Sequence, residues 1–376
     1  MQRYYFDHNA SAPVAPEVLE AMLPTMTEVY GNASSIHHFG QMARQRLDEA
    51  RALVAGLLGS VPEEVVFTSG GTEADNLALA GAAQGGHIVT TSIEHPAVLG
   101  AARRFGQVTV VAVDSRGVVD PDDVRSALRA ETRLISVMHA NNEVGTVQPV
   151  EEIGRIAAEA GVPMHSDGVQ AAGRLGVKAS ELGVALYTIS GHKLHAPKGV
   201  GALYVRKGTG LRPMLFGGAH ERERRAGTEN VPGVVALGRA AQLAMETGAE
   251  ESARQCVLRD RLENAVLNRI ADTHVNGAGA VRTPNTTNIR FDGIDSDALL
   301  IALDLRGFAV SSGAACSSGS TEPSHVLLAM GLTKLEARSS IRFSLGRSNT
   351  AEQVDALIEA LVSSVAHLRR LAPAYA

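Results

Sequence analysis

Seven short strand-like runs recur between positions 64 and 205, and they constrain the fold of this chain more than any other feature. They lie at residues 65–68, 87–91, 108–113, 134–139, 163–166, 187–190 and 202–205. Helical patterns fill most of the gaps between them, for example at residues 122–130. One buried helix face is predicted at Ile153, Ile156, Ala157 and Ala160. Strands that alternate with helices predict an α/β fold with a mainly parallel sheet covered on both faces.

The pattern changes after the polar loop at residues 216–230. A long helical stretch at roughly 234–270 follows, with an apolar seam of Leu258, Leu262, Ala265 and Ile270. The remainder predicts a smaller α/β unit with strands at 287–291, 309–312 and 341–345 and helices at 296–304 and 351–368. A chain of 376 residues, of which 45% are hydrophobic, is long enough to form two such units.

Composition argues against several classes of function. The formal net charge is only -5 and no run of like charges occurs, so we expect no nucleic-acid or anionic-membrane surface. No apolar stretch reaches the roughly 18 residues of a membrane span, and the N-terminus has no secretory pattern. The two cysteines, Cys256 and Cys316, form no CxxC pair and fit neither a disulfide framework nor a zinc site. We therefore expect a cytoplasmic protein.

A lysine, Lys193, follows a predicted buried strand in the sequence S-G-H-K at 190–193 and precedes the glycine-rich stretch 197–201. Such a lysine can form a Schiff base with a cofactor if desolvation or neighbouring cations lower its pKa. The same residues match the S-x-x-K pattern of acyl-transfer enzymes, in which Ser190 would be the nucleophile. That pattern needs S-D-N and K-T-G elements, whereas this chain has S-D-G at 166–168 and no K-T-G. The cofactor lysine is therefore the favoured interpretation.

The sequence T-S-G-G-T-E at 68–73 follows one predicted strand and precedes a helical stretch at 74–83. Glycines let backbone amides approach an anion, and the first turn of a helix supplies unpaired donors, so this segment predicts a phosphate cradle. The alternative is a plain strand-turn-helix in which Ser69 or Thr72 is the N-cap. No Walker lysine and no GxGxxG spacing occur here, so a nucleotide is not implied.

Three polar residues follow other predicted strands. His95 precedes Pro96 at a helix start, where it can stack on a ligand ring, move a proton, or simply satisfy local hydrogen bonds. Asp167 ends the strand at 163–166 and can hold a protonated ring nitrogen or cap a helix, and Gln170 lies three residues on. Ligands of such sheets bind beyond the carboxyl ends of strands, which is where these residues are expected.

Two residues of the C-terminal third could also carry chemistry. Cys316 lies at 311–320 among small residues that offer no apolar cage, so we predict a mobile nucleophilic thiolate there, and Cys256 is predicted to be a buried small hydrophobe. Arg342 alternates with apolar neighbours and should point away from the core face of its strand. It could clamp a carboxylate bidentately or face water.

Taken together, these motifs resemble the NifS/IscS-type cysteine desulfurases of the class V aminotransferase family. The resemblance covers nearly the whole chain, through F-D-H-N-A at 6–10, G-N-A-S-S at 31–35, N-N-E at 141–143, R-A-G-T at 225–228 and S-I-R-F-S at 340–344. It implies a fold-type I transferase that binds pyridoxal 5'-phosphate. A large domain at 13–248 would hold the seven-stranded sheet, and a small domain at 1–12 and 249–376 would carry the cysteine loop.

The resemblance also implies the roles of individual residues. The catalytic residues would be Lys193, Cys316 and His95. The cofactor would be bound by Gly71, Thr72, His95, Asp167, Gln170, Ser190, His192, Lys193 and Thr228, the last from a partner subunit. Asn142, Arg342 and Asn32 would bind the substrate. The resemblance implies metal binding only as transient ligation of an iron-sulfur cluster by Cys316.

The implied reaction takes sulfur from L-cysteine, leaves L-alanine and forms a persulfide on Cys316. A homodimer would then pass the sulfur to an acceptor protein, such as an iron-sulfur cluster scaffold or a tRNA-thiolating enzyme. Two alternatives stay open. A selenocysteine lyase-type β-elimination would use the same cofactor without needing Cys316, and a sulfur-relay scaffold would catalyse nothing.

Overall fold

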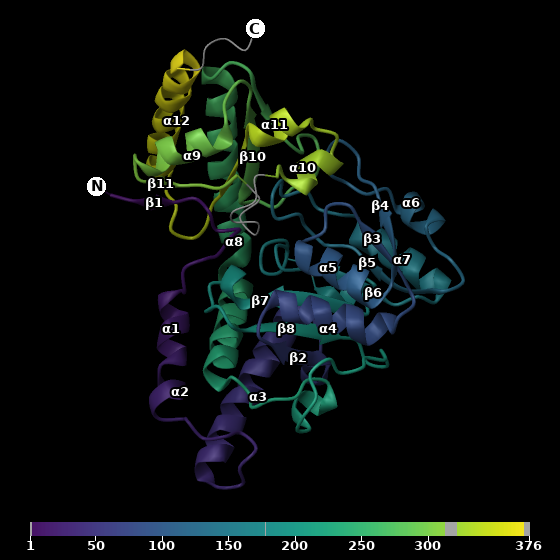
Figure 1. The fold of residues 1–376 in the computed structure, drawn as a ribbon. Coiled ribbons are helices and arrows are strands. Elements are labelled where there is room, and N and C mark those ends of the chain that lie inside the picture. Colours follow the sequence, from purple (N-terminus) through teal and green to yellow (C-terminus); the bar gives the residue numbers. More distant parts are fainter. Residues whose placement is uncertain (1, 177, 313–321, 372–376) are drawn as a thin grey trace.

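The structure is a computed structural model that describes residues 2–176, 178–312 and 322–371 (Figure 1). Its largest sheet has seven strands in the order β2-β8-β7-β6-β5-β3-β4. These strands are β2 (Val65–Thr68), β3 (His87–Thr91), β4 (Gln107–Val111), β5 (Thr132–Ser136), β6 (Met164–Asp167), β7 (Leu186–Ser190) and β8 (Gly201–Val205). The seven predicted strands and the mainly parallel sheet are therefore confirmed.

The strand directions decide which loops meet. β8 pairs antiparallel with both β7 and β2, and the other neighbouring strands are parallel. Two antiparallel steps restore the original direction, so β2 runs the same way as β7 and β6. The carboxyl ends of β2, β3, β6 and β7 therefore lie at one edge of the sheet, and the predicted site motifs follow these four strands.

Both faces of this sheet are covered, because successive strand side chains point to opposite faces. On one face, Val66 packs in an apolar cluster with the helices α4 (Gly71–Ala83) and α5 (Pro96–Phe105). On the other face, Val65 and Phe67 belong to a larger cluster with α3 (His38–Leu58), α7 (Val150–Ala160) and α8 (Val231–Arg269). Figure 1 shows α4 in front of the sheet.

Several helices differ from the prediction. α7 confirms the predicted helix face except at Ala160, which is exposed because the helix ends there and Gly161 caps it with φ of 67°. The predicted helix at 122–130 is the shorter α6 (Pro121–Ser126). α1 (Pro16–Met22), α2 (Pro24–Thr27) and α3, which form the lower part of Figure 1, were not predicted.

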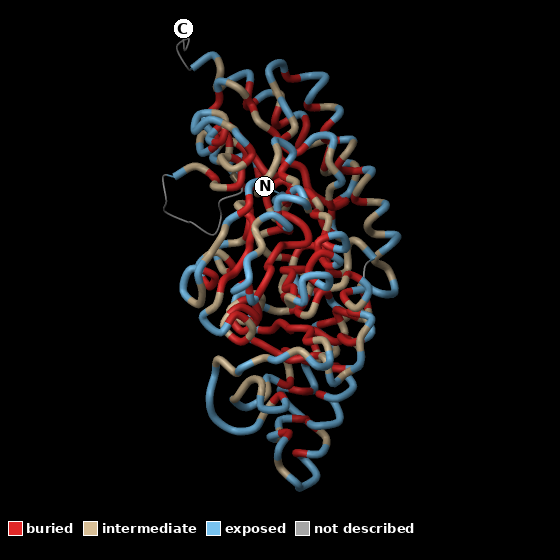
Figure 2. Tube along the Cα trace, turned by 90° about the vertical axis from the view of Figure 1, so that its right-hand side faces the viewer, coloured by how far each residue is buried: buried red, intermediate tan, exposed pale blue. Residues whose placement is uncertain are grey.

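The helix α8 runs out of this first core into a second one. Its predicted seam is largely confirmed, since Leu258, Leu262 and Ile270 are buried and Ala265 is half-buried. The second core surrounds an antiparallel sheet of order β12-β10-β9, made of β9 (Thr273–Val275), β10 (Thr286–Phe291) and β12 (Ser340–Ser344). The helices α9 (Ser296–Asp304) and α12 (Ala351–Leu371) pack in the same core. Figure 2 shows buried residues concentrated through the middle of the molecule.

The predicted strand at 309–312 is shorter than expected. β11 (Phe308–Ala309) pairs in parallel with β1 (Tyr4–Tyr5), and this pairing places Phe6 of the N-terminal segment in the second core. Two short helices, α10 (His325–Ala329) and α11 (Lys334–Arg338), follow further on and were not predicted. None of the helices in the described ranges is long and apolar enough to cross a membrane.

Candidate functional site

A cavity of about 330 Å³ is lined by residues from the loops at the carboxyl edge of the large sheet. Ten of the residues predicted for the site line it: Gly71, Thr72, His95, Asn142, Asp167, Gln170, Ser190, His192, Lys193 and Arg342. They come from loops far apart in the sequence, and Arg342 comes from the second core. The structure therefore brings most of the predicted site together in one place.

Lys193 reaches this cavity from a tight turn. β7 ends at Ser190, and residues Gly191–Lys193 form a single 3-10 turn. A Cβ atom at Gly191 would lie 2.7 Å from the Val200 side chain and 3.0 Å from the Val200 carbonyl oxygen, so glycine is needed for this close approach. The Lys193 Nζ donates hydrogen bonds to the carbonyl oxygens of Asn9 and of Ala10, the latter at 2.8 Å. The amine is thus held at the cavity wall by neutral acceptors.

The glycine-rich loop before α4 has the form expected of an anion cradle. The N-cap residue is Gly70, and no side chain caps the helix, so the alternative with Ser69 or Thr72 as N-cap is wrong. A Cβ atom at Gly71 would come within 3.0 Å of the Val169 side chain. The uncapped first turn therefore opens onto the cavity with its backbone donors available.

Glu73 holds this loop in place. It accepts a hydrogen bond from the Ser69 amide at 2.8 Å and from the Arg225 Nε at 2.8 Å. Burial alone would raise the pKa of Glu73, but the hydrogen bonds from Arg225 and Ser69 lower it overall. Glu73 therefore joins the cradle to the R-A-G-T segment at 225–228.

Two buried carboxyl groups lie in the cavity wall. Asp167 accepts a hydrogen bond from the Val169 amide at 2.9 Å. Burial raises the pKa of Asp167, and the charges of His95 and Lys193 together with the Val169 amide oppose that rise. Asp75 is 1% exposed, and burial and the charge of Asp167 raise its pKa well above the usual value. A cationic ligand group beside Asp167 would favour its ionised form.

His95 makes a local hydrogen bond and also lines the cavity. Its Nδ1 accepts a hydrogen bond from the Ala97 amide at 3.1 Å and so caps α5, while the ring lines the cavity. The local hydrogen bond therefore fixes the ring orientation without removing the ring from the site.

Arg342 is 2% exposed, so the alternative that it faces water is wrong. Its Nη2 donates to Asp7 Oδ1 at 2.7 Å and its Nη1 to the Asn142 carbonyl oxygen at 3.1 Å. Its Nε is buried and has no hydrogen-bond partner among the described residues. Arg342 lines the cavity, where its guanidinium could bind a substrate carboxylate.

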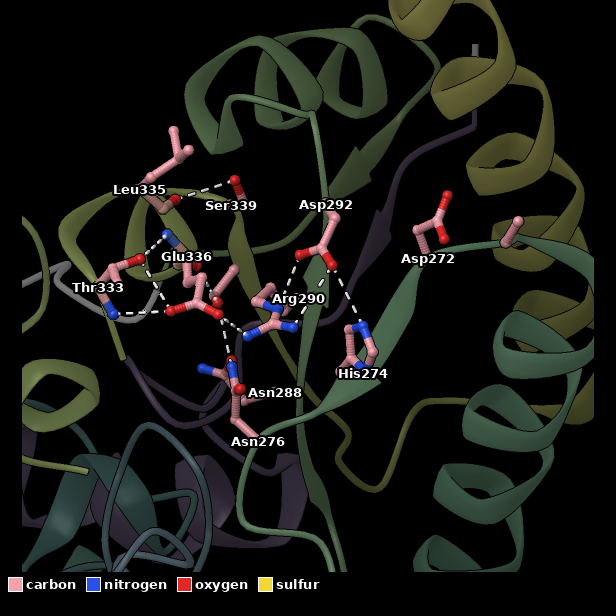
Figure 3. A network of polar contacts seen from close by, with 12 residues as sticks. Asp272, His274, Asn276, Asn288, Arg290, Asp292, Thr333, Leu335, Glu336 and Ser339 are labelled. Atoms are coloured by element: carbon pink, nitrogen blue, oxygen red, sulfur yellow. Dashed lines mark hydrogen bonds and ion pairs between the residues drawn. The ribbon is translucent and has the colours of Figure 1, made fainter. Parts of the chain in front are cut away.

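The segment that carries Asn142 is braced by the second core. Asn288 donates to the Glu143 carbonyl oxygen at 3.3 Å and accepts from Asn276 at 2.7 Å. Figure 3 shows the polar network around these residues, in which Arg290 joins β10 to Glu336 of α11. Ser324 donates to Glu143 Oε2 at 2.5 Å, so it is joined to the residue next to Asn142.

Three predicted residues do not line the cavity. Asn32 is exposed and accepts a hydrogen bond from the Ser34 amide at 2.9 Å. Thr228 lines a separate cavity of about 140 Å³ together with Thr68 and Ser69. Cys316 lies outside the described residues. Within those residues no group of three or more His, Cys, Asp or Glu side chains could hold a metal ion.

Cys256 is half-buried, so its prediction as a buried small hydrophobe is wrong. Its sulfur lies 3.1 Å from Arg259 Nη2 and 3.7 Å from an Asp260 carboxylate oxygen. The side chain of Cys256 therefore lies in a polar environment at the surface of α8, and not among apolar side chains.

The most connected residue of the site was missed. The Asn9 carbonyl oxygen accepts hydrogen bonds from Lys193 and from Gln170 Nε2, and its side chain donates to Thr286 Oγ1 at 2.8 Å. Asn9 therefore joins the N-terminal segment, the cavity and β10. Its place in the F-D-H-N-A motif was the only signal in the sequence.

Comparisons with known proteins agree with this geometry. Residues 4–357 match the aminotransferase class-V family. The chain is 48% identical to a cysteine desulfurase of Nostoc sp., over 99% of this chain and 95% of that protein. It is 45% identical to the cysteine desulfurase IscS of Dictyoglomus turgidum, over 98% of this chain and 96% of that protein. Among solved structures, a NifS-like protein has a TM-score of 0.91 with 37% identity, covering 98% of this chain and 100% of that one.

Proposed function

We infer the function from one premise: the chain belongs to the aminotransferase class-V family and, within it, to the cysteine desulfurases. Such an enzyme removes the sulfur of L-cysteine and leaves L-alanine. One observation on this chain supports that function most directly. A single cavity is lined by Lys193, Asp167, His95 and Arg342.

Pyridoxal 5'-phosphate is the cofactor that we propose, and the cavity fits it. The uncapped start of α4 and the crowded Gly71 suit a phosphate, with Thr72, Ser190 and His192 beside it. Asp167 is a buried carboxyl that a protonated ring nitrogen would keep ionised. When bound through Lys193, the cofactor supplies a ring that accepts the electron pair left by a broken Cα–H bond.

In this proposal, individual side chains have separate roles. Arg342 binds the substrate carboxylate from the cavity wall, and Asn142 lines the same cavity. Lys193 would remove the substrate Cα proton through its Nζ. His95 would lie against the cofactor ring, and Gln170 would donate a hydrogen bond to the ring oxygen.

Cys316 completes the reaction in this proposal. Its thiolate would form a bond with the substrate sulfur while the bond between that sulfur and the substrate Cβ breaks. The electron pair of the broken bond stays with the substrate carbon skeleton, which takes up a proton and leaves as alanine, and a persulfide remains on Cys316. The sulfur then passes to an acceptor protein, for which we propose an iron-sulfur cluster scaffold. We keep transient cluster ligation by Cys316 as part of the same proposal.

We also propose a cytoplasmic homodimer in which Thr228 of one copy reaches the phosphate in the other. Thr228 is exposed and outside the central cavity of its own chain, which supports this arrangement. The two apolar cores support a division into a large domain at 13–248 and a small domain at 1–12 and 249–376, because Phe6 packs in the second core.

Replacing the two cysteines tests the role of Cys316. We expect Cys316→Ala to keep the visible absorption of the bound cofactor and to lose alanine formation from cysteine by roughly two orders of magnitude. Cys256→Ala is the matched control and should turn over as the wild type does. Alanine release would be quantified after cysteine is added to each purified protein. Unchanged turnover of Cys316→Ala would instead favour a lyase that needs no thiolate.

A further inference from the structure

Arg174 is a half-buried residue that the proposed function does not use. It lies in the turn after β6, four residues beyond Gln170, and it does not line the central cavity. It lines a smaller cavity of about 70 Å³ on the other side of Lys193. Its guanidinium binds carbonyl oxygens: Nη1 donates to Gln170 Oε1 at 2.6 Å and to the Gln170 main chain at 3.1 Å, and Nη2 donates to the Lys193 main chain at 3.3 Å.

These contacts determine the orientation of the Gln170 side-chain amide, that is, the positions of its oxygen and its nitrogen. An amide oxygen accepts hydrogen bonds and an amide nitrogen donates two. Arg174 engages Oε1, and Nε2 donates to the Asn9 carbonyl oxygen at 3.1 Å. The opposite orientation would place Oε1 against the Asn9 carbonyl and Nε2 against the guanidinium, with two repulsive contacts. Gln170 lines the cavity, so its second Nε2 hydrogen is the group that it offers to a ligand.

The same set of hydrogen bonds includes Lys193, the lysine proposed to bind the cofactor. The Asn9 carbonyl oxygen accepts from both Gln170 Nε2 and Lys193 Nζ, and Arg174 binds Gln170 and the Lys193 carbonyl oxygen. Hydrogen bonds thus form a closed circuit through Arg174, Gln170, Asn9 and Lys193. A guanidinium is required, because its planar fork reaches several acceptors at once and a lysine ammonium does not have that geometry.

We propose that Arg174 is a positioning residue that orients the Gln170 amide as a donor toward the cofactor ring oxygen. This proposal rests on the proposed function, since it concerns the same cofactor. Burial lowers the pKa of Arg174 to about 10, so the group stays cationic at neutral pH.

The test is the affinity of the protein for pyridoxal 5'-phosphate, measured by equilibrium dialysis and by quenching of intrinsic tyrosine fluorescence. We expect Arg174→Gln to raise the dissociation constant roughly tenfold, which is the loss of about one good hydrogen bond. Arg174→Lys should recover only part of the affinity. Arg254→Gln is the matched control, since Arg254 is also half-buried and binds main-chain carbonyl oxygens, but lines no part of the cavity. It should bind the cofactor as the wild type does.

A double-variant cycle separates positioning from general weakening of the fold. If Arg174 acts through Gln170, then Gln170→Met combined with Arg174→Gln should bind the cofactor within about twofold of Gln170→Met alone. Independent losses that multiply would overturn the proposal, as would wild-type affinity in Arg174→Gln. Should Arg174→Gln fail to fold, the cycle is run with Arg174→Lys. Wild-type protein that binds no pyridoxal phosphate would instead overturn the proposed function itself.

Discussion

Glu94 is a buried carboxyl group beside His95 that no part of the proposed reaction uses. Its Oε1 accepts hydrogen bonds from Thr91 Oγ1 at 2.7 Å and from the Met138 amide at 2.8 Å. Its Oε2 is buried without a hydrogen-bond partner among the described residues. Burial, against these two hydrogen bonds, raises the pKa of Glu94 to about 8. The native state therefore binds a proton that the unfolded chain releases at neutral pH.

This difference predicts a pH dependence of stability. A raised native pKa gives stability that is fully present below the unfolded value of about 4.3 and is lost as the pH rises toward 8. Glu94→Gln keeps a neutral group there, so its unfolding free energy should lack this loss, which is up to about 1.4 kcal/mol per pH unit. Urea unfolding of the cofactor-free protein between pH 5 and 9 measures the slope.

The control for this experiment is Glu151→Gln, at an exposed position on α7. Its stability should follow the wild-type pH profile. A Glu94→Gln profile parallel to that of the wild type would show that Glu94 is ionised in the native state and would contradict the prediction.

At the scale of elements, the strands of the large sheet were predictable and the first helices were not. Strands buried on both faces appear as continuous apolar runs between turns, and this pattern is local. Helix α3 buries Ala43, Ala50 and Ala55 beside larger residues, so its apolar face is weak in the sequence although it packs closely against α8. β11 pairs with β1 from the other end of the chain, and such pairing has no local signal.

The residues of the site also differ in how far the sequence could predict them. Lys193, Asp167, His95 and the cradle were predictable because each follows a strand, and the shared strand direction brings them to one edge. Asn9 was missed because it contacts Lys193 across 184 positions through packing that no local pattern encodes. Arg174 was missed for a similar reason, because the three carbonyl oxygens that it binds are brought together only by the folded chain.

The loop that leads to Thr228 is held in an unusual conformation. Residues Glu221, Arg222 and Glu223 have φ values of 46°, 56° and 63°, which non-glycine residues adopt at a cost. Glu221 offsets that cost through a buried ion pair in which both Arg51 Nη atoms lie 2.7 Å from its carboxylate oxygens. The Phe67 amide donates to the same carboxylate at 2.9 Å. A buried ion pair thus anchors the loop to β2.

Removing one partner of this pair should be costly. We expect Arg51→Met to lower the unfolding free energy by about 3–5 kcal/mol, because Glu221 is left buried and unpaired. Arg46→Met, which breaks the exposed pair with Glu49, should change it by about 0–1 kcal/mol. Both values come from urea unfolding at one pH. Equal effects of the two substitutions would mean that the buried pair does not hold the loop.

At the scale of the whole molecule, the segment between α2 and the start of α3, which lies at the lower end of Figure 1, exposes apolar side chains. Tyr30 is 66% exposed, Ile36 91% and Phe39 45%, and the rings of Tyr30 and Phe39 stack at 5.5 Å. Exposed apolar groups that gather in this way are typical of interaction surfaces. Asn32 belongs to the same segment, and like Thr228 it was predicted for the site but does not line the cavity of its own chain. A second copy that covers this segment would explain both observations.

Mixing two inactive variants tests whether the site is shared. Lys193→Ala removes the cofactor lysine, and Thr228→Asp places a carboxylate where phosphate oxygens are expected, so each homodimer should form little alanine. If Thr228 serves the other copy, a mixed dimer has one site with both residues intact and one with neither. Random pairing of co-expressed chains at equal amounts then gives about a quarter of the wild-type alanine-forming sites. If Thr228 served its own chain, every mixed dimer would be inactive. Mixing the double variant with wild type is the control, for which shared sites give about a quarter of the wild-type sites and unshared sites about half.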